Sequence, residues 1–398
     1  MERSLMSQQL INRSVDLTRL RDEGYDVEVR SSYLLVKNVP YVNCRMEIKL
    51  GILVSELSLA GDVTTVPGTH VVMFSGDHPC HKDGTEMVEI KHGSSPQQLD
   101  RDLVVHHSFS SKPSGGYRDY HEKMATYVAI ISSPAHAIDA TVTAKTFPII
   151  ETNEEESVFN YIDTASSRAG INVVARKLEI GKIAIVGLGG TGSYVLDLVA
   201  KTPVREIHLF DGDSFSQHNA FRSPGAPSVE ELREKPQKVV FFQKKYSRMR
   251  RGIIAHDCYL ESTNVDELRG MDFVFLCLDS GAARRLIVTK LEEFGVPLID
   301  VGMGLHQVGE SLLGVLRITS STSTHREHVQ DGNRIPFSDF DGNNDYSRNI
   351  QVADLNALSA ALAVIKWKKL FTFYLDLENE YHSTYTIDGN ALTNEDRP

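Results

Sequence analysis

The chain has 398 residues, of which 41% are hydrophobic and 24% charged, a composition typical of soluble globular proteins. Its formal net charge of −11 argues against general nucleic-acid binding, and no apolar run reaches the roughly 18 residues that a membrane-spanning helix needs. The four cysteines lack metal-site spacing, and the N-terminus lacks the apolar core of a signal peptide. We therefore expect a reduced, cytoplasmic protein of more than one domain that binds neither nucleic acid nor membrane.

The first 150 residues have the pattern of a separate, smaller α+β domain. A helical pattern near the N-terminus ends at Gly24, and short apolar runs follow it, separated by turns rich in Gly, Pro, Asn and Asp. The runs predict strands within 31–39, 69–76, 102–110, 124–132 and 138–147. Several histidines lie in this part, and His78 and His81 flank Cys80. Because zinc takes nitrogen and sulfur ligands, a metal site and ordinary surface histidines are both open interpretations.

After a linker over 151–180, strands alternate with helices across residues 181–398. The apolar runs predict strands at 183–186, 206–210, 252–257, 272–278, 298–301, 312–319 and 383–387. The remaining patterns predict helices at 192–201, 229–249, 264–269, 281–294 and 354–374, and a polar loop over about 320–350. Such alternation is typical of a Rossmann-like α/β fold with a doubly wound, mostly parallel sheet.

Residues 183–193, in the first strand and turn of this region, read IAIVGLGGTGS. The apolar run of a buried strand stops at Gly187, and Gly189, Gly190 and Gly192 follow before a helical pattern begins. Glycines let the backbone approach phosphate groups closely, and the next helix offers free N–H groups and the positive end of its dipole. The stretch therefore predicts the opening of a nucleotide-binding βαβ unit, without saying which nucleotide it binds.

Charged side chains follow the later strands. Asp211 ends the second strand, where a dinucleotide-binding fold holds a ribose, and Asp213 comes shortly after it. Asn219 and Arg222 lie in the same loop, and arginine matches phosphate oxygens with a planar fork. Lys238, at the start of later helical sequence, is a second cation for the same crevice. Two cations beside a ribose carboxylate favour a triphosphate ligand over a nicotinamide.

A further carboxylate, Asp279, follows the strand predicted at 272–278, at the sheet edge where open α/β folds bind ligands. A carboxylate there suits Mg²⁺, which takes one or two carboxylates together with phosphate oxygens. Each residue alone has a plain alternative, since Asp213 can cap a turn, Lys238 can be a solvated lysine, and Asp279 can cap the helix at 281–294. Their arrival at successive strand ends favours the nucleotide site.

The segments GLGGTGS, DGDSFSQHNAFR, KPQKV and CLDS together resemble the motifs of the ThiF/MoeB/HesA family, the ubiquitin-activating superfamily of adenylyltransferases. The resemblance covers about residues 180–370. It implies that Asp211 holds the ribose of ATP and that Asp279 organises Mg²⁺. It also implies that Asn219 and the catalytic cations Arg222 and Lys238 contact the phosphates. Family members also use an arginine ahead of the first strand, often donated across a dimer, for which Arg168 is the best match. The full ATP-binding set implied is Gly187, Gly189, Gly190, Gly192, Asp211, Asp213, Asn219, Arg222, Lys238 and Arg168.

The sequence departs from the family pattern in the crossover loop. Many members pass the acyl group to a cysteine there, but no cysteine follows Cys277 in this chain. The expected loop offers hydroxyls instead, with His325 and His328 as candidate bases. Three readings stay open, in which the reaction stops at the adenylate, the chain is a partner subunit of another catalyst, or a hydroxyl forms an oxyester. The candidate catalytic hydroxyls are those of Ser320, Ser321 and Ser323.

The resemblance implies an enzyme that uses ATP and Mg²⁺ to adenylate the C-terminal carboxylate of a ubiquitin-like protein. It also implies a homodimer, and relatives with such N-terminal extensions look like members of bacterial systems that include conjugating-enzyme-like partners. The N-terminal domain is then expected to dock the ubiquitin-like protein or the conjugating enzyme. Two rival functions stay open, an NAD(P)-dependent oxidoreductase, which shares the glycine turn and Asp211, and a non-catalytic partner subunit of an activating enzyme.

Overall fold

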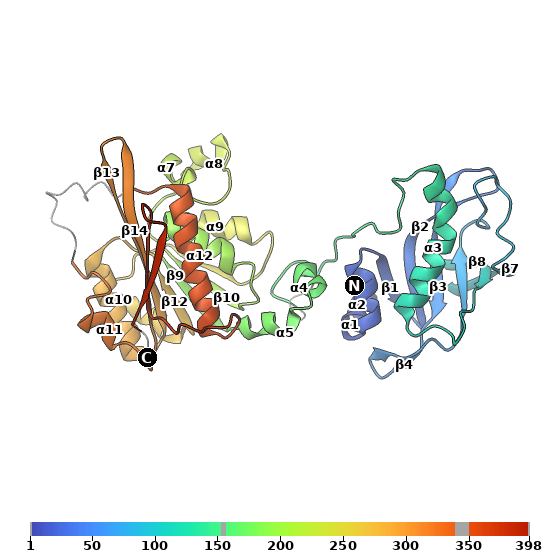
Figure 1. Ribbon diagram of the computed structural model, residues 1–398, viewed down its shortest axis with the longest axis horizontal. Helices are drawn as coiled ribbons and strands as arrows, with labels where there is room; N and C mark the ends of the chain where they lie inside the picture. The colour runs from blue at the N-terminus through green and yellow to red at the C-terminus, as the bar shows by residue number, and fades with distance from the viewer. Residues whose placement is uncertain (1, 153–156, 339–349, 397–398) are drawn as a thin grey trace. The chain divides into compact units, whose positions relative to one another are not determined.

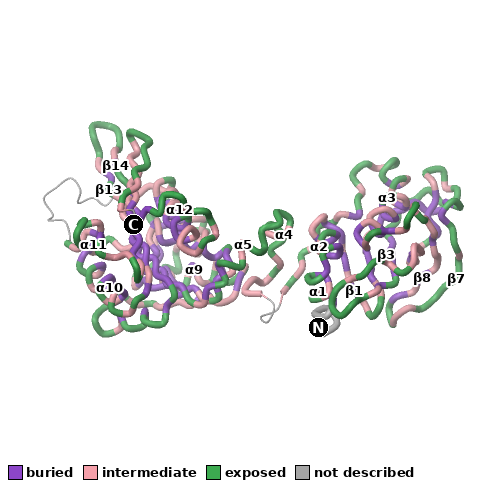
Figure 2. Tube along the Cα trace, turned by 60° about the horizontal axis from the view of Figure 1, so that its bottom comes forward, coloured by how far each residue is buried: buried purple, intermediate pink, exposed green. Residues whose placement is uncertain are grey.

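The computed structural model describes residues 2–152, 157–338 and 350–396 (Figure 1). The chain divides into two compact units, each with its own hydrophobic core, and the buried segments drawn in Figure 2 gather inside each unit. The N-terminal unit comprises Met1–Ile150 with Ser167–Ala169, and the C-terminal unit comprises Glu151–Ser166 with Gly170–Pro398.

The N-terminal unit is built on a six-stranded antiparallel sheet in the order β1-β2-β3-β6-β8-β7. The helix α3 packs against β2 (Figure 1). Side chains such as Phe74, Phe109 and Tyr127 fill the core. The strands span Asp26–Arg30 (β1), Tyr33–Val42 (β2), Ile48–Glu56 (β3), Leu59–Ala60 (β4), Val63–Thr64 (β5), Val71–Ser75 (β6), Lys91–Asp100 (β7) and Leu103–Ser110 (β8). The helices span Glu2–Arg13 (α1), Val15–Asp22 (α2) and Tyr120–Ile138 (α3).

The strand predicted over 124–132 is wrong, because this segment is the middle of α3. Asp119 caps the helix by accepting a hydrogen bond from the backbone N–H of Glu122 at 2.7 Å. The apolar run that looked like a strand is one buried face of the helix with small residues between its members. That face consists of Tyr120, Met124, Tyr127, Val128, Ile131 and Ala135. The strand predicted over 138–147 is also wrong, since only a single bridge between Lys145 and Tyr25 forms there.

The C-terminal unit contains an eight-stranded sheet in the order β11-β10-β9-β12-β13-β14-β15-β16. The first five of these strands are parallel and the remaining pairings are antiparallel, which confirms the expected α/β fold with a mostly parallel sheet. The strands span Lys182–Val186 (β9), Glu206–Phe210 (β10), Ile253–His256 (β11), Phe273–Leu276 (β12), Leu298–Val308 (β13), Ser311–Ser321 (β14), His382–Thr386 (β15) and Ala391–Glu395 (β16).

Helices cover both faces of this sheet because successive side chains of its central strand point to opposite sides. Ile183 and Ile185 of β9 join the core under α6, α9 and α12, whereas Ala184 and Val186 join the core under α10 and η2. The helices span Thr164–Arg168 (α4), Asn172–Ala175 (α5), Arg176–Leu178 (η1), Gly190–Val199 (α6), Gln217–Ala220 (α7), Val229–Glu234 (α8), Lys238–Tyr246 (α9), Val265–Gly270 (η2), Gly281–Phe294 (α10), Glu327–Asp331 (α11) and Ala353–Leu370 (α12). Across the described ranges, no helix is long and apolar enough to cross a membrane.

The long helix predicted over 229–249 is divided into α8 and α9. It begins as expected, with the Ser228 hydroxyl accepting a hydrogen bond from the N–H of Glu231 at 3.2 Å. It breaks at Lys235, which has φ 45°, because the following residue is a proline that disfavours a helical conformation before it. The break makes Lys238 the first residue of a new helix and turns its side chain into the unit.

Candidate nucleotide site

The glycine turn lies at the carboxyl edge of the parallel sheet, between β9 and α6. Gly187 has φ +88°, and a Cβ there would lie 2.5 Å from the carbonyl oxygen of Cys277, just past β12. A Cβ on Gly192 would lie 1.8 Å from the carbonyl oxygen of Gly187, so both positions require glycine. The N-cap residue of α6 is Gly189, which has no side chain to cap the first turn. The turn thus presents bare backbone at a helix N-terminus, an arrangement suited to phosphate.

Asp211 follows β10 directly and braces the glycine turn. One carboxylate oxygen accepts the backbone N–H of Leu188 at 2.7 Å, and the other accepts the backbone N–H of Asp213 at 2.9 Å. The residue is only 7% exposed. A carboxylate at the end of the second strand and against the turn occupies the place of the ribose-binding acid in dinucleotide-binding folds.

Lys238 brings a cation to the same carboxylates. Its Nζ lies 2.5 Å from a carboxylate oxygen of Asp213 and 3.3 Å from one of Asp211, and its side chain is 7% exposed. Burial alone would raise the pKa of Asp213, but hydrogen bonds from Lys238 and Tyr259, together with the charge of Arg222, lower it overall. The ion pair therefore persists at neutral pH, and it places a positive charge beside the glycine turn.

The loop after β10 adds buried donors. Asn219 is 3% exposed, and its side-chain oxygen accepts the backbone N–H of Ser216 at 2.8 Å. Within the described part of the chain, Nδ2 of Asn219 and Nε of Arg222 are buried and have no hydrogen-bond partner. Buried donors without an acceptor are costly, and the oxygens of a phosphate would accept from both. The structure thus brings Asn219 and Arg222 together with Asp211, Asp213 and the glycine turn.

One residue of the site has no counterpart in the sequence motifs. Asn356 lies in the first turn of α12, which packs along α6, and it is fully buried. Its Oδ1 accepts a hydrogen bond from the Thr191 hydroxyl at 2.9 Å, and its Nδ2 donates to the backbone carbonyl of Arg222 at 3.4 Å. Sequence reasoning missed it because 165 positions separate it from the turn. An amide among the apolar residues of a helix is the signal that could have indicated it.

Asp279 is exposed and follows β12, whose end lies against Gly187. The alternative role, capping of α10, belongs to Ser280, whose hydroxyl accepts the N–H of Ala283 at 3.4 Å. The described residues include no group of three or more His, Cys, Asp or Glu side chains that could hold a metal ion, and this holds for the N-terminal histidines as well. The single carboxylate of Asp279 is a donor of the type that Mg²⁺ takes beside phosphate oxygens.

The loop expected over about 320–350 begins two residues later than predicted, because Ser320 and Ser321 are the last residues of β14, and it contains the short helix α11. Their side chains are 0% and 3% exposed. The Ser320 hydroxyl donates to the carbonyl oxygen of Tyr381 at 3.2 Å, and Ser321 pairs with Leu298 at the start of β13. Both hydroxyls are therefore part of the sheet rather than of a crossover loop, and the rest of the predicted loop lies partly outside the described residues.

The strand register separates these serines from the glycine turn. Val186, the last residue of β9, pairs with Leu276, which pairs with Asp300, and Asp300 pairs with Thr319 of β14. Because β14 runs in the opposite direction, Ser320 and Ser321, which follow Thr319 in the strand, lie farther from the carboxyl edge. The exposed Ser323 follows in a turn beyond the strand. None of the three candidate serines joins the nucleotide site.

The candidate bases lie with the serines. The rings of His325 and His328 stack with centroids 4.8 Å apart, and Nε2 of His328 lies 2.9 Å from the carbonyl oxygen of Ser320, not from its hydroxyl. Burial, with the neighbouring His325, lowers the pKa of His328. Arg168 ends α4 and belongs to the N-terminal unit, where its guanidinium lies 5.5 Å from the ring centroid of Phe147. Its role as an arginine donated across a dimer stays a prediction.

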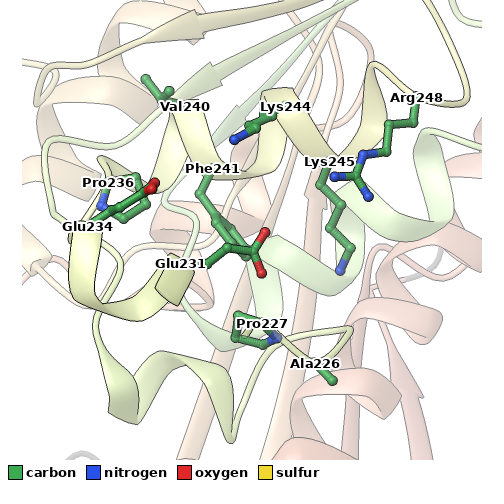
Figure 3. Close-up of a pocket in the computed structure, with 10 residues that line it drawn as sticks. All are labelled: Ala226, Pro227, Glu231, Glu234, Pro236, Val240, Phe241, Lys244, Lys245 and Arg248. Atoms are coloured by element: carbon green, nitrogen blue, oxygen red, sulfur yellow. The ribbon is translucent and has the colours of Figure 1, made fainter. Parts of the chain in front are cut away.

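A pocket of about 240 Å³ lies between α8 and α9 (Figure 3). Phe241 contributes apolar surface, Lys244, Lys245 and Arg248 contribute cations, and Glu231 faces them from α8. None of the residues predicted to bind ATP lines this pocket. The nucleotide site at the glycine turn is therefore distinct from it.

Comparison with known families divides the chain in the same region as the structure does. Residues 15–164 match a domain of unknown function, DUF6791, and residues 160–315 match the ThiF family. The chain thus carries a ThiF-family domain preceded by a second domain, and the resemblance inferred from the motifs is confirmed.

Solved structures similar to this chain include two that contain a nucleotide. E. coli MccB with ATP is 17% identical with a TM-score of 0.43, over 56% of this chain and 66% of that chain. PaaA is 16% identical with a TM-score of 0.42, over 56% and 75%. E. coli tRNA N6-threonylcarbamoyladenosine dehydratase, TcdA, in complex with AMP is 16% identical with a TM-score of 0.39, over 52% and 93%.

Proposed function

We propose that the C-terminal unit is an adenylyltransferase that binds ATP and activates the C-terminal carboxylate of a ubiquitin-like protein in a bacterial conjugation pathway. The observation that carries the proposal is the convergence of Asp211, Lys238 and Arg222 on the glycine turn. The carboxylate suits a ribose, and the two cations with the bare backbone of the turn suit a polyphosphate. The ThiF family match supports the same chemistry.

In the proposed reaction, a carboxylate oxygen of the substrate attacks the α-phosphorus of ATP. A new carboxylate–phosphorus bond forms, the bond between the α-phosphorus and the bridging oxygen breaks, and pyrophosphate leaves with the electron pair. Lys238 exchanges its contact with Asp213 for phosphate oxygens, and the guanidinium of Arg222 donates to the negative charge that spreads in the transition state. Asp211 holds the ribose while it keeps the turn in place through Leu188. Alignment and charge neutralisation thus supply most of the catalysis.

The residues present fit one Mg²⁺ ion that accompanies ATP. Asp279 would hold it from the end of β12, together with phosphate oxygens and water. When bound, the ion would neutralise charge on the departing pyrophosphate.

We further propose that the chain releases its product as the acyl-adenylate to the nucleophile of a conjugating-enzyme-like partner. The strand register places Ser320 and Ser321 away from the glycine turn. This arrangement supports release of the acyl-adenylate over formation of an oxyester on the chain itself. Cys277 is the thiol nearest the turn, but burial, followed by the charge of Asp300, raises its pKa, which disfavours a thiolate. Homodimerisation and docking by the N-terminal unit belong to the same proposal.

An oxidoreductase that binds NAD(P) would use the glycine turn and Asp211 but would leave two features without a role. These are the cation pair of Lys238 and Arg222, and the unpartnered donors on Asn219 and Arg222. A non-catalytic partner subunit would have no need of the full set of predicted ATP-binding residues. In the experiment below, absence of exchange with NAD⁺ binding indicates the oxidoreductase, and absence of exchange without NAD⁺ binding indicates the non-catalytic subunit.

The test is exchange of radiolabelled pyrophosphate into ATP by the full chain with MgCl₂ and a candidate ubiquitin-like protein. The same small protein with its C-terminal carboxylate converted to an amide is the matched control. We expect exchange with the free carboxylate, none with the amide, and none with Asp279→Ala. Exchange with the amide would contradict carboxylate activation. Absence of exchange, together with tight binding of NAD⁺ and none of ATP, would favour the oxidoreductase.

A further inference from the structure

We propose that Asn356 is a positioning residue that joins the two phosphate-facing segments of the nucleotide site, the glycine turn and the loop that carries Arg222. The inference rests on the proposed binding of ATP. It adds to the site a residue of α12 that lies outside every recognised motif and outside the residues 160–315 that match the ThiF family.

The side-chain amide makes one contact to each segment. Its Oδ1 accepts from the hydroxyl of Thr191, the residue between the last two glycines of the turn, at 2.9 Å. Its Nδ2 donates to the main-chain carbonyl of Arg222 at 3.4 Å. Asparagine supplies an acceptor and a donor on one short, planar group, whereas aspartate at neutral pH is an acceptor only. The residue type is therefore matched to joining a hydroxyl and a carbonyl.

The packing leaves the amide little freedom to move. Asn356 is 0% exposed, and the backbone N–H of the residue donates to the carbonyl of Val352 at 3.0 Å within the first turn of α12. A Cβ on Gly190 would lie 2.1 Å from Nδ2 and 2.4 Å from Cγ of the amide. The second glycine of the Gly189-Gly190 pair is therefore required by Asn356, in addition to any need for close approach of phosphate.

Two hydrogen bonds within the loop also shape its Arg222 end. The backbone N–H of Arg222 donates to the carbonyl of Asn219 at 3.1 Å, and the hydroxyl of Ser223 donates to the same carbonyl at 2.7 Å. These bonds shape the loop internally, and Asn356 ties it to the helix that packs along α6. A site whose parts are fixed before the ligand arrives loses less free energy on binding. Without the amide, this direct tie between the loop and the turn is lost, and ATP has to supply it on binding.

The experiment measures binding of MgATP to the full chain by calorimetry. For Asn356→Ala we expect the Kd to rise by about tenfold or more, and for Asn356→Asp a similar loss, because the donor to Arg222 is gone. The matched control is Ser359→Ala on the same helix. Ser359 is also 0% exposed, but its hydroxyl has no hydrogen-bond partner among the described residues, so its Kd should equal that of the wild type.

A double-mutant cycle separates positioning from general destabilisation. If Asn356 acts by placing the Arg222 loop, the loss caused by Asn356→Ala should shrink when Arg222 is already alanine. The inference would be overturned if the increases in Kd of the two single variants simply multiply in the double variant. A wild-type Kd for Asn356→Ala would overturn it as well. Should the alanine variant fail to fold, Thr191→Val against Thr191→Ser tests the same link, and equal Kd values for these two would overturn it. A wild-type chain that binds no MgATP would instead remove the proposed function and the inference with it.

Discussion

The ammonium group of Lys238 lies 2.5 Å from the carboxylate of Asp213, and this contact joins α9 to the loop after β10. The backbone makes the same connection, because the N–H of Lys238 donates to the carbonyl of Asp213 at 2.9 Å. A lysine held this way is placed before a nucleotide arrives. It needs only to exchange one anionic partner for another, which costs less than ordering a free side chain.

Replacement of this lysine should weaken ATP binding without unfolding the protein. For Lys238→Met we expect the Kd for MgATP to rise by at least about tenfold, because a buried cation beside the phosphates is lost. The control is Lys244→Met, which removes an exposed lysine from the same helix. Equal affinities of the two variants, measured by calorimetry, would show that Lys238 does not contact the nucleotide.

The candidate serines should be dispensable for activation. We expect Ser320→Ala, Ser321→Ala and Ser323→Ala to keep wild-type rates of pyrophosphate exchange, because the strand register holds them away from the glycine turn. The buried Ser320→Ala should lower the free energy of unfolding by about 1 kcal/mol, since it loses a hydrogen bond to Tyr381. A covalent adduct between the chain and the ubiquitin-like protein that resists thiol reductant, and that one of these variants loses, would return the oxyester to consideration.

Lys123 should make the stability of the N-terminal unit depend on pH. The residue is fully buried, its Nζ donates to the Ser55 hydroxyl and to the Thr69 carbonyl, both at 2.8 Å, and burial lowers its pKa to about 8. Because the unfolded lysine keeps a pKa near 10.4, the unfolded state binds more protons between pH 8 and 10. Stability should therefore rise with pH across that window.

Denaturant unfolding of the wild type and of Lys123→Met at pH 7 and pH 10 measures this dependence. The difference in unfolding free energy between the two proteins should change by up to about 3 kcal/mol, with the wild type gaining at high pH. Parallel pH profiles would show that Lys123 keeps an ordinary pKa in the folded protein.

Arg250 should be important for the stability of the C-terminal unit. Its side chain is 0% exposed and donates only to backbone carbonyls, those of Arg251, Thr202, Val204 and Arg205. Burial lowers the pKa of Arg250 to about 10, so the group is still charged at neutral pH. We expect Arg250→Ala to lower the free energy of unfolding by about 3 kcal/mol, because several buried acceptors lose their donor.

Arg250→Lys is the informative companion variant. A lysine ammonium lacks the planar fork that reaches several carbonyls at once, so we expect it to recover less than half of the loss. Thermal unfolding measures both variants. Full recovery by lysine would mean that charge, not the geometry of the guanidinium, holds this region.

The determinants of the candidate nucleotide site are local in the sequence. Gly187 needs a left-handed backbone, and Asp211 needs only to follow a buried strand. Both requirements are set by residues within a few positions of the site. The alternation of apolar runs likewise predicts the sheet, because each strand of a parallel sheet is buried on both faces.

The failures arise where distant segments decide the outcome. The run at 124–132 is apolar enough for a strand, and only its packing against β2 and the cap at Asp119 select a helix. Ser320 and Ser321 look like loop residues until Tyr381, just before β15, and Leu298 of β13 provide backbone partners for them. Asn356 is connected to the site through a helix far along the chain, and no local pattern contains that information.

Calorimetric titration of the full chain with MgATP, and in parallel with NAD⁺, tests the central claim most directly. The claim predicts a Kd for MgATP in the micromolar range, no measurable binding of NAD⁺, and loss of ATP binding in Asp211→Ala. Binding of NAD⁺ in place of ATP, or unchanged ATP binding in Asp211→Ala, would contradict an ATP site built on the glycine turn.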